Sequence, residues 1–143
     1  MRALLDVNVL IALLDSAHVH HRVATAWLDD NLDQGWASCP LTQNGCLRIL
    51  SSPSYPSPLP LTEVADRLAQ ATAHASHAFW ADSVSLLDGG RISWRHVLSG
   101  RQLTDAYLLA LAVDRGGCFV TFDRGLALQA VRGAEVERLV TLA

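Results

Sequence analysis

The sequence predicts a three-layer α/β/α fold with a mainly parallel central sheet. Short apolar runs that suit buried strands alternate with longer apolar segments that suit helices, from one end of the chain to the other. Half of the 143 residues are hydrophobic, which is enough to build a sizeable core in a single domain over residues 1–143. Strands that alternate with helices in this way form parallel sheets, and helices cover both faces of such sheets.

The first third of the chain is predicted to contain two strand–helix units. A short apolar run ends at Asp6, and the apolar residues that follow contain no Gly or Pro, so a strand is followed by a helix. Pro40 suits the first position of a helix, because its missing N–H would have no partner there. The expected strands are 2–5 and 36–38, and the expected helices are 7–14, 19–32 and 40–51.

The middle of the chain is less regular. Residues 51–60 hold four prolines and four serines, so this segment must be an extended connection rather than a helix or a central strand. Residues 61–77 carry apolar side chains at helical spacing and are expected to form a helix. A short extended piece with a turn is expected at 78–87, and 88–101 shows no regular pattern.

The last third of the chain again alternates between helix and strand. Thr104 can cap a helix over 105–115, and Gly116 and Gly117 end it. The apolar run at 118–122 predicts a buried strand. We expect a last helix at 124–131 and a last strand at 136–140.

Composition and charge exclude several classes of protein. The net charge is −3, which argues against binding nucleic acid by broad neutralisation of phosphates. Any reaction on nucleic acid must therefore depend on a small local site. All eleven basic residues are arginines, which excludes P-loop, Schiff-base and Ser–Lys mechanisms. The spacing of Cys39, Cys46 and Cys118 fits neither a zinc ribbon nor a disulfide framework. No apolar run reaches the ~18 residues of a membrane span, so we expect a soluble cytoplasmic protein that does not bind membranes.

Three aspartates, Asp6, Asp105 and Asp123, are predicted to meet at one edge of the sheet. Asp6 and Asp123 follow predicted parallel strands, and Asp105 begins a helix whose rise of roughly 16 Å is matched by the strand that returns. Side chains at these points of an α/β fold gather at the carboxyl ends of the strands. A hard divalent cation, Mg²⁺ or Mn²⁺, is the obvious reason to tolerate such crowding of carboxylates, and it could hold a phosphodiester.

Each of these aspartates also has a structural explanation. Asp6 can cap the helix that follows it, Asp105 suits the positive end of a helix dipole, and Asp123 can start a turn before Gly125. Taken singly, the structural explanation is the stronger one for each residue. Taken together, their predicted convergence favours a metal site.

Several segments resemble the signature motifs of PIN-domain ribonucleases. They are Leu-Leu-Asp-Val-Asn-Val-Leu-Ile at 4–11, Leu-Thr-Asp-Ala-Tyr-Leu-Leu-Ala-Leu-Ala at 103–112 and Val-Thr-Phe-Asp at 120–123, in this order. The segment at 39–51 resembles the second motif of the family, and the likeness is greatest to VapC-like toxins of toxin–antitoxin systems. The resemblance implies a PIN-like fold, Mg²⁺- or Mn²⁺-dependent cleavage of RNA, a homodimer, and inhibition by a small antitoxin protein whose segment lies over the acidic cleft.

The resemblance also implies roles for individual residues. Asp6 and Asp105 match the principal metal ligands, and Asp123 matches a further acid of the same cluster. Asn8 and Thr121 match supporting polar positions. One position departs from the family, because Gln43 stands where the second motif usually has a glutamate; an amide cannot act as a base, so metal affinity and activity are expected to be weakened. On this interpretation Gln43→Glu should tighten the binding of a divalent ion.

Two other functions compete with this one. The run from Asp6 to Leu10 resembles the nucleophile loop of haloacid-dehalogenase-like phosphatases, but Asn8 replaces the second acid and the required lysine is absent. The other alternative is a binding module, either a nuclease fold that is weakly active or inactive because of Gln43 or a scaffold that binds a partner. We expect the remaining conspicuous residues to be structural or exposed: His18, His20 and His21, then His74 and His77 on one face of a surface helix, and Trp27 and Trp36 in the core.

Overall fold

The computed structural model describes residues 1–143 and contains a five-stranded sheet in which every paired strand is parallel. The strand order is β3-β2-β1-β4-β5. The strands are β1 (Ala3–Leu5), β2 (Trp36–Ser38), β3 (His77–Phe79), β4 (Cys118–Thr121) and β5 (Leu139–Thr141). The helices are α1 (Val7–Leu14), α2 (His21–Asn31), α3 (Pro40–Leu50), α4 (Leu61–Thr72) and α5 (Leu103–Asp114).

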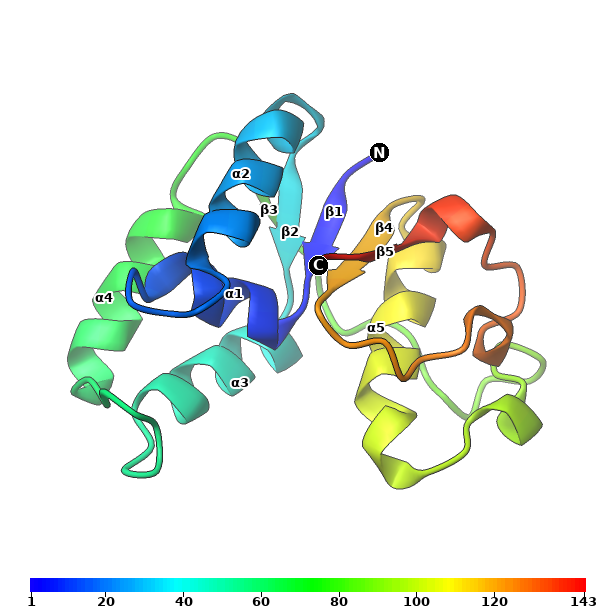
Figure 1. Ribbon diagram of the computed structural model, residues 1–143. Helices are drawn as coiled ribbons and strands as arrows, with labels where there is room; N and C mark the ends of the chain where they lie inside the picture. Colours follow the sequence, from blue (N-terminus) through cyan, green and yellow to red (C-terminus); the bar gives the residue numbers. More distant parts are fainter.

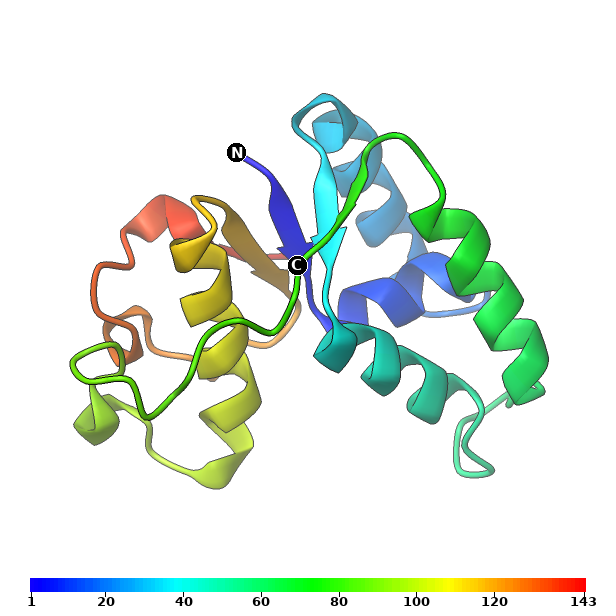
Figure 2. The same ribbon diagram turned by 180° about the vertical axis from the view of Figure 1, so that it is seen from behind.

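Helices cover both faces of the sheet, as Figures 1 and 2 show. Helices α1 to α4 lie on one side, and α5 lies on the other with the irregular segments around it. Side chains alternate between the two layers: Leu4 and Phe119 pack in the core beside α5, whereas Leu5 and Val120 pack in the core beside α1, α3 and α4. The predicted three-layer α/β/α fold with a parallel sheet is therefore confirmed.

The register of the central strands brings polar residues to one edge of the sheet. Leu5 of β1 lies opposite Val120 of β4, and the backbone N–H of Asp6 continues the ladder by donating to the carbonyl of Val120 over 2.9 Å. Because the two strands are parallel, Asp6 and Thr121 arrive together at their carboxyl ends. At the other end of these strands, Gly117 allows the two backbones to lie close together, since a Cβ there would lie 2.4 Å from the carbonyl oxygen of Arg2.

The structure corrects three details of the predicted elements. The helix expected at 124–131 is an irregular segment with one 3-10 turn, Leu128–Ala130, because its backbone pairs with residues 92–93 instead of with itself. The helix expected at 61–77 ends at Thr72, and His77 begins β3, which pairs with β2, so the extended piece expected from 78 starts one residue earlier. The final strand begins at Leu139 rather than at 136, after a 3-10 turn.

Helix α5 also begins differently from the prediction. Its first residue is Leu103 and its N-cap is Gln102, so Thr104 is not the cap. Gln102 instead uses its side chain to join neighbouring segments: it accepts from the backbone N–H of Leu98 over 2.8 Å and donates to the carbonyl of Gly125 over 2.7 Å. This ties the start of α5 to the segment after β4. No helix of the structure is long and apolar enough to cross a bilayer.

Candidate functional site

Asp6 stands at the junction of β1 and α1, and its carboxylate is held on both oxygens. Oδ1 accepts a hydrogen bond from the backbone N–H of Val7 over 2.7 Å, so Asp6 is the N-cap of α1 as well as a candidate site residue. Oδ2 accepts from the hydroxyl of Thr121 over 2.6 Å. The side chain is buried, with 6 % of Asp6 exposed, and burial raises its pKa although both hydrogen bonds lower it. The local cap and the site are therefore compatible roles for one side chain.

Thr121 links three segments of the site through one hydroxyl. Its Oγ1 donates to Asp6, and it accepts from the backbone N–H of Asp123 over 3.0 Å and from Nδ2 of Asn8 over 3.3 Å. A hydroxyl has one proton and two lone pairs, so all of its hydrogen-bonding capacity is used. Asn8 adds a second link, because its Oδ1 accepts from the backbone N–H of Phe122 over 3.3 Å. This network fixes Asp6 relative to the end of β4.

Asp105 lies in the first turn of α5 and is also buried, with 8 % exposed. Burial, together with the nearby charges of Asp6 and Asp123, raises the pKa of its carboxyl to about 7. The helix dipole favours an acid at this position, but it does not offset burial beside two other carboxylates. The site is therefore short of positive charge.

Asp123 follows β4 and is exposed. Its Oδ1 accepts from the backbone N–H of Gly125 over 2.8 Å, so it starts the expected turn. Its charge raises the pKa of both Asp6 and Asp105, which shows that the three carboxylates are neighbours. No group of three or more His, Cys or acidic side chains in the structure has the spacing of a ready metal-binding set. The donors nevertheless fit a hard divalent ion, because Mg²⁺ usually takes one or two carboxylates and keeps several waters.

Gln43 contacts the end of β2 rather than the aspartates. Its Nε2 donates to the hydroxyl of Ser38 over 3.0 Å, and that hydroxyl also bonds Nε2 of His77 over 2.8 Å. Gln43 lines a hollow between α3 and α4, whereas Gly45 faces Val7 of α1. The structure records no hydrogen bond between Gln43 and the aspartates.

The other conspicuous residues take structural roles. His77 is in β3 rather than on a surface helix, and burial lowers its pKa. His21 bonds the carbonyl of Ala12 over 2.7 Å, and the ring of His20 stacks on Phe122 with centroids 4.6 Å apart. Trp36 is buried in the core, as expected.

The raised pKa of Asp105 predicts a pH-dependent stability of the metal-free protein. A carboxyl whose pKa rises on folding favours the folded state most when protonated, so this contribution is lost as pH increases from about 4 to about 7. Asp105→Asn, which stays neutral, should therefore be more stable than the wild type by at least ~1 kcal/mol at about pH 8, but not at about pH 4. Urea unfolding in EDTA across this range measures the difference.

The matched control for this measurement is Asp29→Asn, which neutralises an exposed acid on α2. We expect that variant to follow the wild type at every pH. A constant difference between Asp105→Asn and the wild type would contradict the assigned pKa. Saturating Mg²⁺ should stabilise the wild type and leave Asp105→Asn almost unchanged, since the ion needs the carboxylate.

The motifs on this edge of the sheet are matched by a family model. The PIN domain model covers residues 3–132, which is most of the chain and includes all three aspartates. The chain belongs to the PIN-domain family. The resemblance noted in the sequence is therefore confirmed, and the site described above is the acidic edge of a PIN fold.

Named relatives of this PIN domain come from Mycobacterium tuberculosis (strain ATCC 25618 / H37Rv). Ribonuclease VapC44 is 54% identical over 142 residues, which is 99% of this chain and 100% of that protein. Ribonuclease VapC39 is 44% identical over 135 residues, covering 93% of this chain and 96% of that protein. The crystal structure of VapBC2 from Rickettsia felis bound to a DNA fragment from its promoter has a chain that matches with a TM-score of 0.58. The match covers 100% of both chains at 11% identity, so this likeness is one of fold.

Proposed function

We propose that this PIN domain is a metal-dependent endoribonuclease, the toxin of a VapC-type toxin–antitoxin pair. The main observation behind this proposal is that Asp6 and Asp105, 99 positions apart in the sequence, are both buried at one edge of the sheet, where the charge of Asp6 raises the pKa of Asp105. Full-length likeness to proteins named Ribonuclease VapC supports RNA as the substrate.

The residues divide into those that would hold the ion and those that position them. Asp6 and Asp105 would hold Mg²⁺ or Mn²⁺, with Asp123 as a further acid at the exposed side. When bound, such an ion polarises a phosphodiester and lowers the pKa of water. Thr121 and Asn8 keep the carboxylate of Asp6 in place. Burial of the two principal acids excludes bulk water from that side of the site, which strengthens their interaction with a cation.

An apolar hollow near the site supports the proposal of an antitoxin partner. It encloses about 360 Å³ and includes Leu41 at the start of α3 and Leu103, Thr104 and Tyr107 at the start of α5. Thr104 precedes Asp105 in the first turn of α5, so a protein segment that fills the hollow would have to extend beyond it to reach the acids. A cation from that segment would neutralise the carboxylates and displace the metal.

The proposal also includes a homodimer and a cytoplasmic location. Exposed apolar side chains such as Leu87, Leu98 and Val136 are consistent with a homodimer. The three cysteines are free and buried, which suits a reducing cytoplasm.

The direct test is cleavage of single-stranded and structured RNA by the purified chain. We expect internal cleavage in Mg²⁺ or Mn²⁺ and none in excess EDTA. Cleavage that continues in EDTA would contradict the metal dependence. RNA binding without cleavage under every divalent ion would favour the inactive binding module.

The contribution of Gln43 is tested by Gln43→Glu. If Gln43 belongs to the metal site, the added carboxylate should tighten Mg²⁺ or Mn²⁺ binding several-fold in a calorimetric titration. An unchanged affinity would place Gln43 outside the site, which its hydrogen bond to Ser38 favours. Gln70→Glu is the matched control, because it makes the same change at an exposed position of α4.

A further inference from the structure

We propose that a hollow formed by Trp94, Arg95 and Arg132 binds nucleotides of the RNA substrate away from the cleaved bond, with a base on the indole and phosphates on the two guanidinium groups. This inference rests on the proposed function and adds to it a second, separate place where the substrate is held. It concerns single-stranded RNA, whose bases are free to stack on aromatic side chains.

The hollow has the size and lining of a ligand site. It encloses about 700 Å³ and is lined by Ile92, Ser93, Trp94, Arg95, Gln129 and Arg132. Trp94 is 48 % exposed, so part of its large apolar ring faces solvent. Indole and guanidinium groups side by side are the combination that binds single strands, because every base has a face that can stack.

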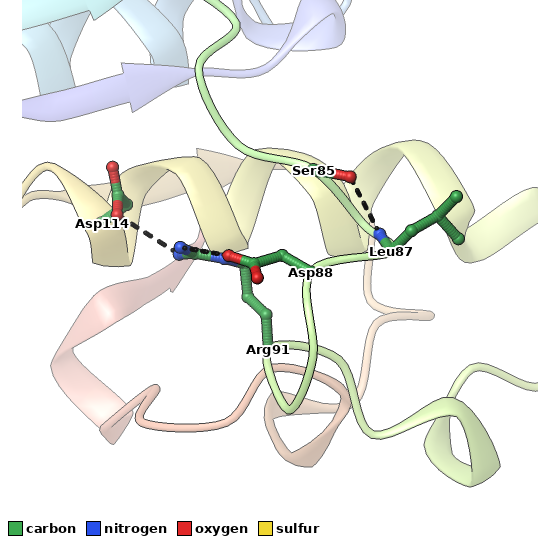
Figure 3. Close-up of polar contacts among 5 residues, drawn as sticks. All are labelled: Ser85, Leu87, Asp88, Arg91 and Asp114. Atoms are coloured by element: carbon green, nitrogen blue, oxygen red, sulfur yellow. Dashed lines mark hydrogen bonds and ion pairs between the residues drawn. The ribbon is translucent and has the colours of Figure 1, made fainter.

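The charges around the hollow support an anionic ligand. The structure contains three ion pairs, and two of them belong to Arg91, which lies between Asp88 at 3.4 Å and Asp114 at 3.3 Å (Figure 3). Neither Arg95 nor Arg132 has an acidic partner or any recorded side-chain hydrogen bond. Asp88 and Asp114 are thus paired with Arg91, and Arg95 and Arg132 remain exposed and unpaired in a chain whose net charge is −3.

The hollow is held in shape before any ligand binds. The bridge between Ile92 and Val131 is antiparallel, and both residues are buried in the core beside α5. The backbone N–H of Ser93 donates to Ala130 over 2.9 Å, and that of Arg132 donates to Arg91 over 3.0 Å. Figure 3 shows that Arg91 also fastens its loop to α5 through Asp114. A preformed hollow needs little ordering on binding, which favours affinity.

The chain between this hollow and the acidic edge carries further arginines. The segment after Trp94 leads through Arg101 and Gln102 into α5, whose first turn carries Asp105. Gln102 bonds the carbonyl of Gly125, two residues beyond Asp123. Arg101 and Arg124 are exposed along this connection. The segments that carry the aspartates and Trp94 thus hold further exposed cations that RNA phosphates could contact.

The first experiment measures binding without cleavage. A fluorescently labelled single-stranded RNA is titrated into the Asp6→Asn protein in EDTA and followed by anisotropy. In that background we expect Trp94→Leu to weaken binding about tenfold and Trp94→Phe to weaken it less, because a smaller ring still stacks. The double variant Arg95→Gln with Arg132→Gln should reduce the slope of log K against log salt by about 1.4, as expected for two lost phosphate contacts to a single strand.

The matched control is Arg22→Gln, which removes an exposed arginine on α2, on the other side of the sheet. It should change neither the affinity nor the salt slope by a comparable amount. With Asp6 restored, the arginine double variant should raise KM for a long RNA and leave kcat nearly unchanged, because the hollow holds the substrate away from the reacting atoms.

The possible results separate this inference from the proposed function. If the wild type cleaves RNA and the hollow variants behave like Arg22→Gln, the hollow is overturned and the ribonuclease stands. If the wild type neither binds nor cleaves RNA, both are overturned. If the arginine variant loses affinity for a short poly-glutamate peptide but not for RNA, the hollow belongs to an acidic protein partner and the inference is wrong.

Discussion

Asp6→Asn is expected to reduce RNA cleavage by about a thousandfold or more, which corresponds to roughly 4 kcal/mol of transition-state stabilisation. The substitution removes one charge from the cluster and keeps the size of the side chain. Its amide oxygen can still accept from the backbone N–H of Val7 and cap α1. Because burial already raises the pKa of Asp6, neutralising it should not unfold the protein.

The measurement is single-turnover cleavage of a defined RNA in Mg²⁺, with circular dichroism to show that the variant folds. Asp105→Asn should lose activity to a similar extent, since it removes the other buried acid. Asp29→Asn makes the same chemical change on the surface of α2 and should retain full activity. Unimpaired cleavage by a folded Asp6→Asn protein would remove the aspartates from the mechanism.

Thr121→Val is expected to lower both divalent-ion affinity and cleavage by about 10- to 100-fold, although its hydroxyl need not touch metal or substrate. Valine has nearly the same shape but cannot donate to Asp6 or accept from Asn8 and the backbone N–H of Asp123. These groups would remain without partners at a position only 1 % exposed, so the variant should also lose about 1–3 kcal/mol of stability.

The conservative variant distinguishes positioning from simple destabilisation. Thr121→Ser restores the hydroxyl and should recover most of the metal affinity. Thr141→Val removes an exposed hydroxyl directly opposite Thr121 on β5 and should leave metal binding unchanged. If Thr121→Ser is as defective as Thr121→Val, the hydroxyl does not hold Asp6 in place as described.

The strand–helix units around the acids were the most predictable part of the molecule. The run before Asp6 and the run before Asp123 are short and apolar because both faces of the central strands are buried, and that burial is visible in composition alone. Gly116 and Gly117 limit the length of the helix that carries Asp105, and the strand after them leads to Asp123. Simple rises per residue were therefore enough to predict that these carboxylates are neighbours.

Other features depended on contacts between distant segments. The local sequence predicts an extended piece from residue 78, but nothing in it shows that His77 belongs to this strand or that the strand pairs with β2. Residues 124–131 also have helical spacing, but Ala130 and Val131 use their backbone groups to pair with residues 92–93. The hollow around Trp94 joins two segments that are separated by more than 30 positions, so no motif could indicate it.

The sequence by itself determined the strand–helix units around the acids, the parallel sheet and which aspartates are candidates for the site, because these follow from periodicity, spacing and the few residues that end helices. Tertiary structure alone decided that Thr121 holds Asp6, that Gln43 bonds Ser38, and that Arg95 and Arg132 stay unpaired while Arg91 does not. Hydrogen bonds and ion pairs act over a few ångströms, so they are fixed only when packing has brought remote segments together.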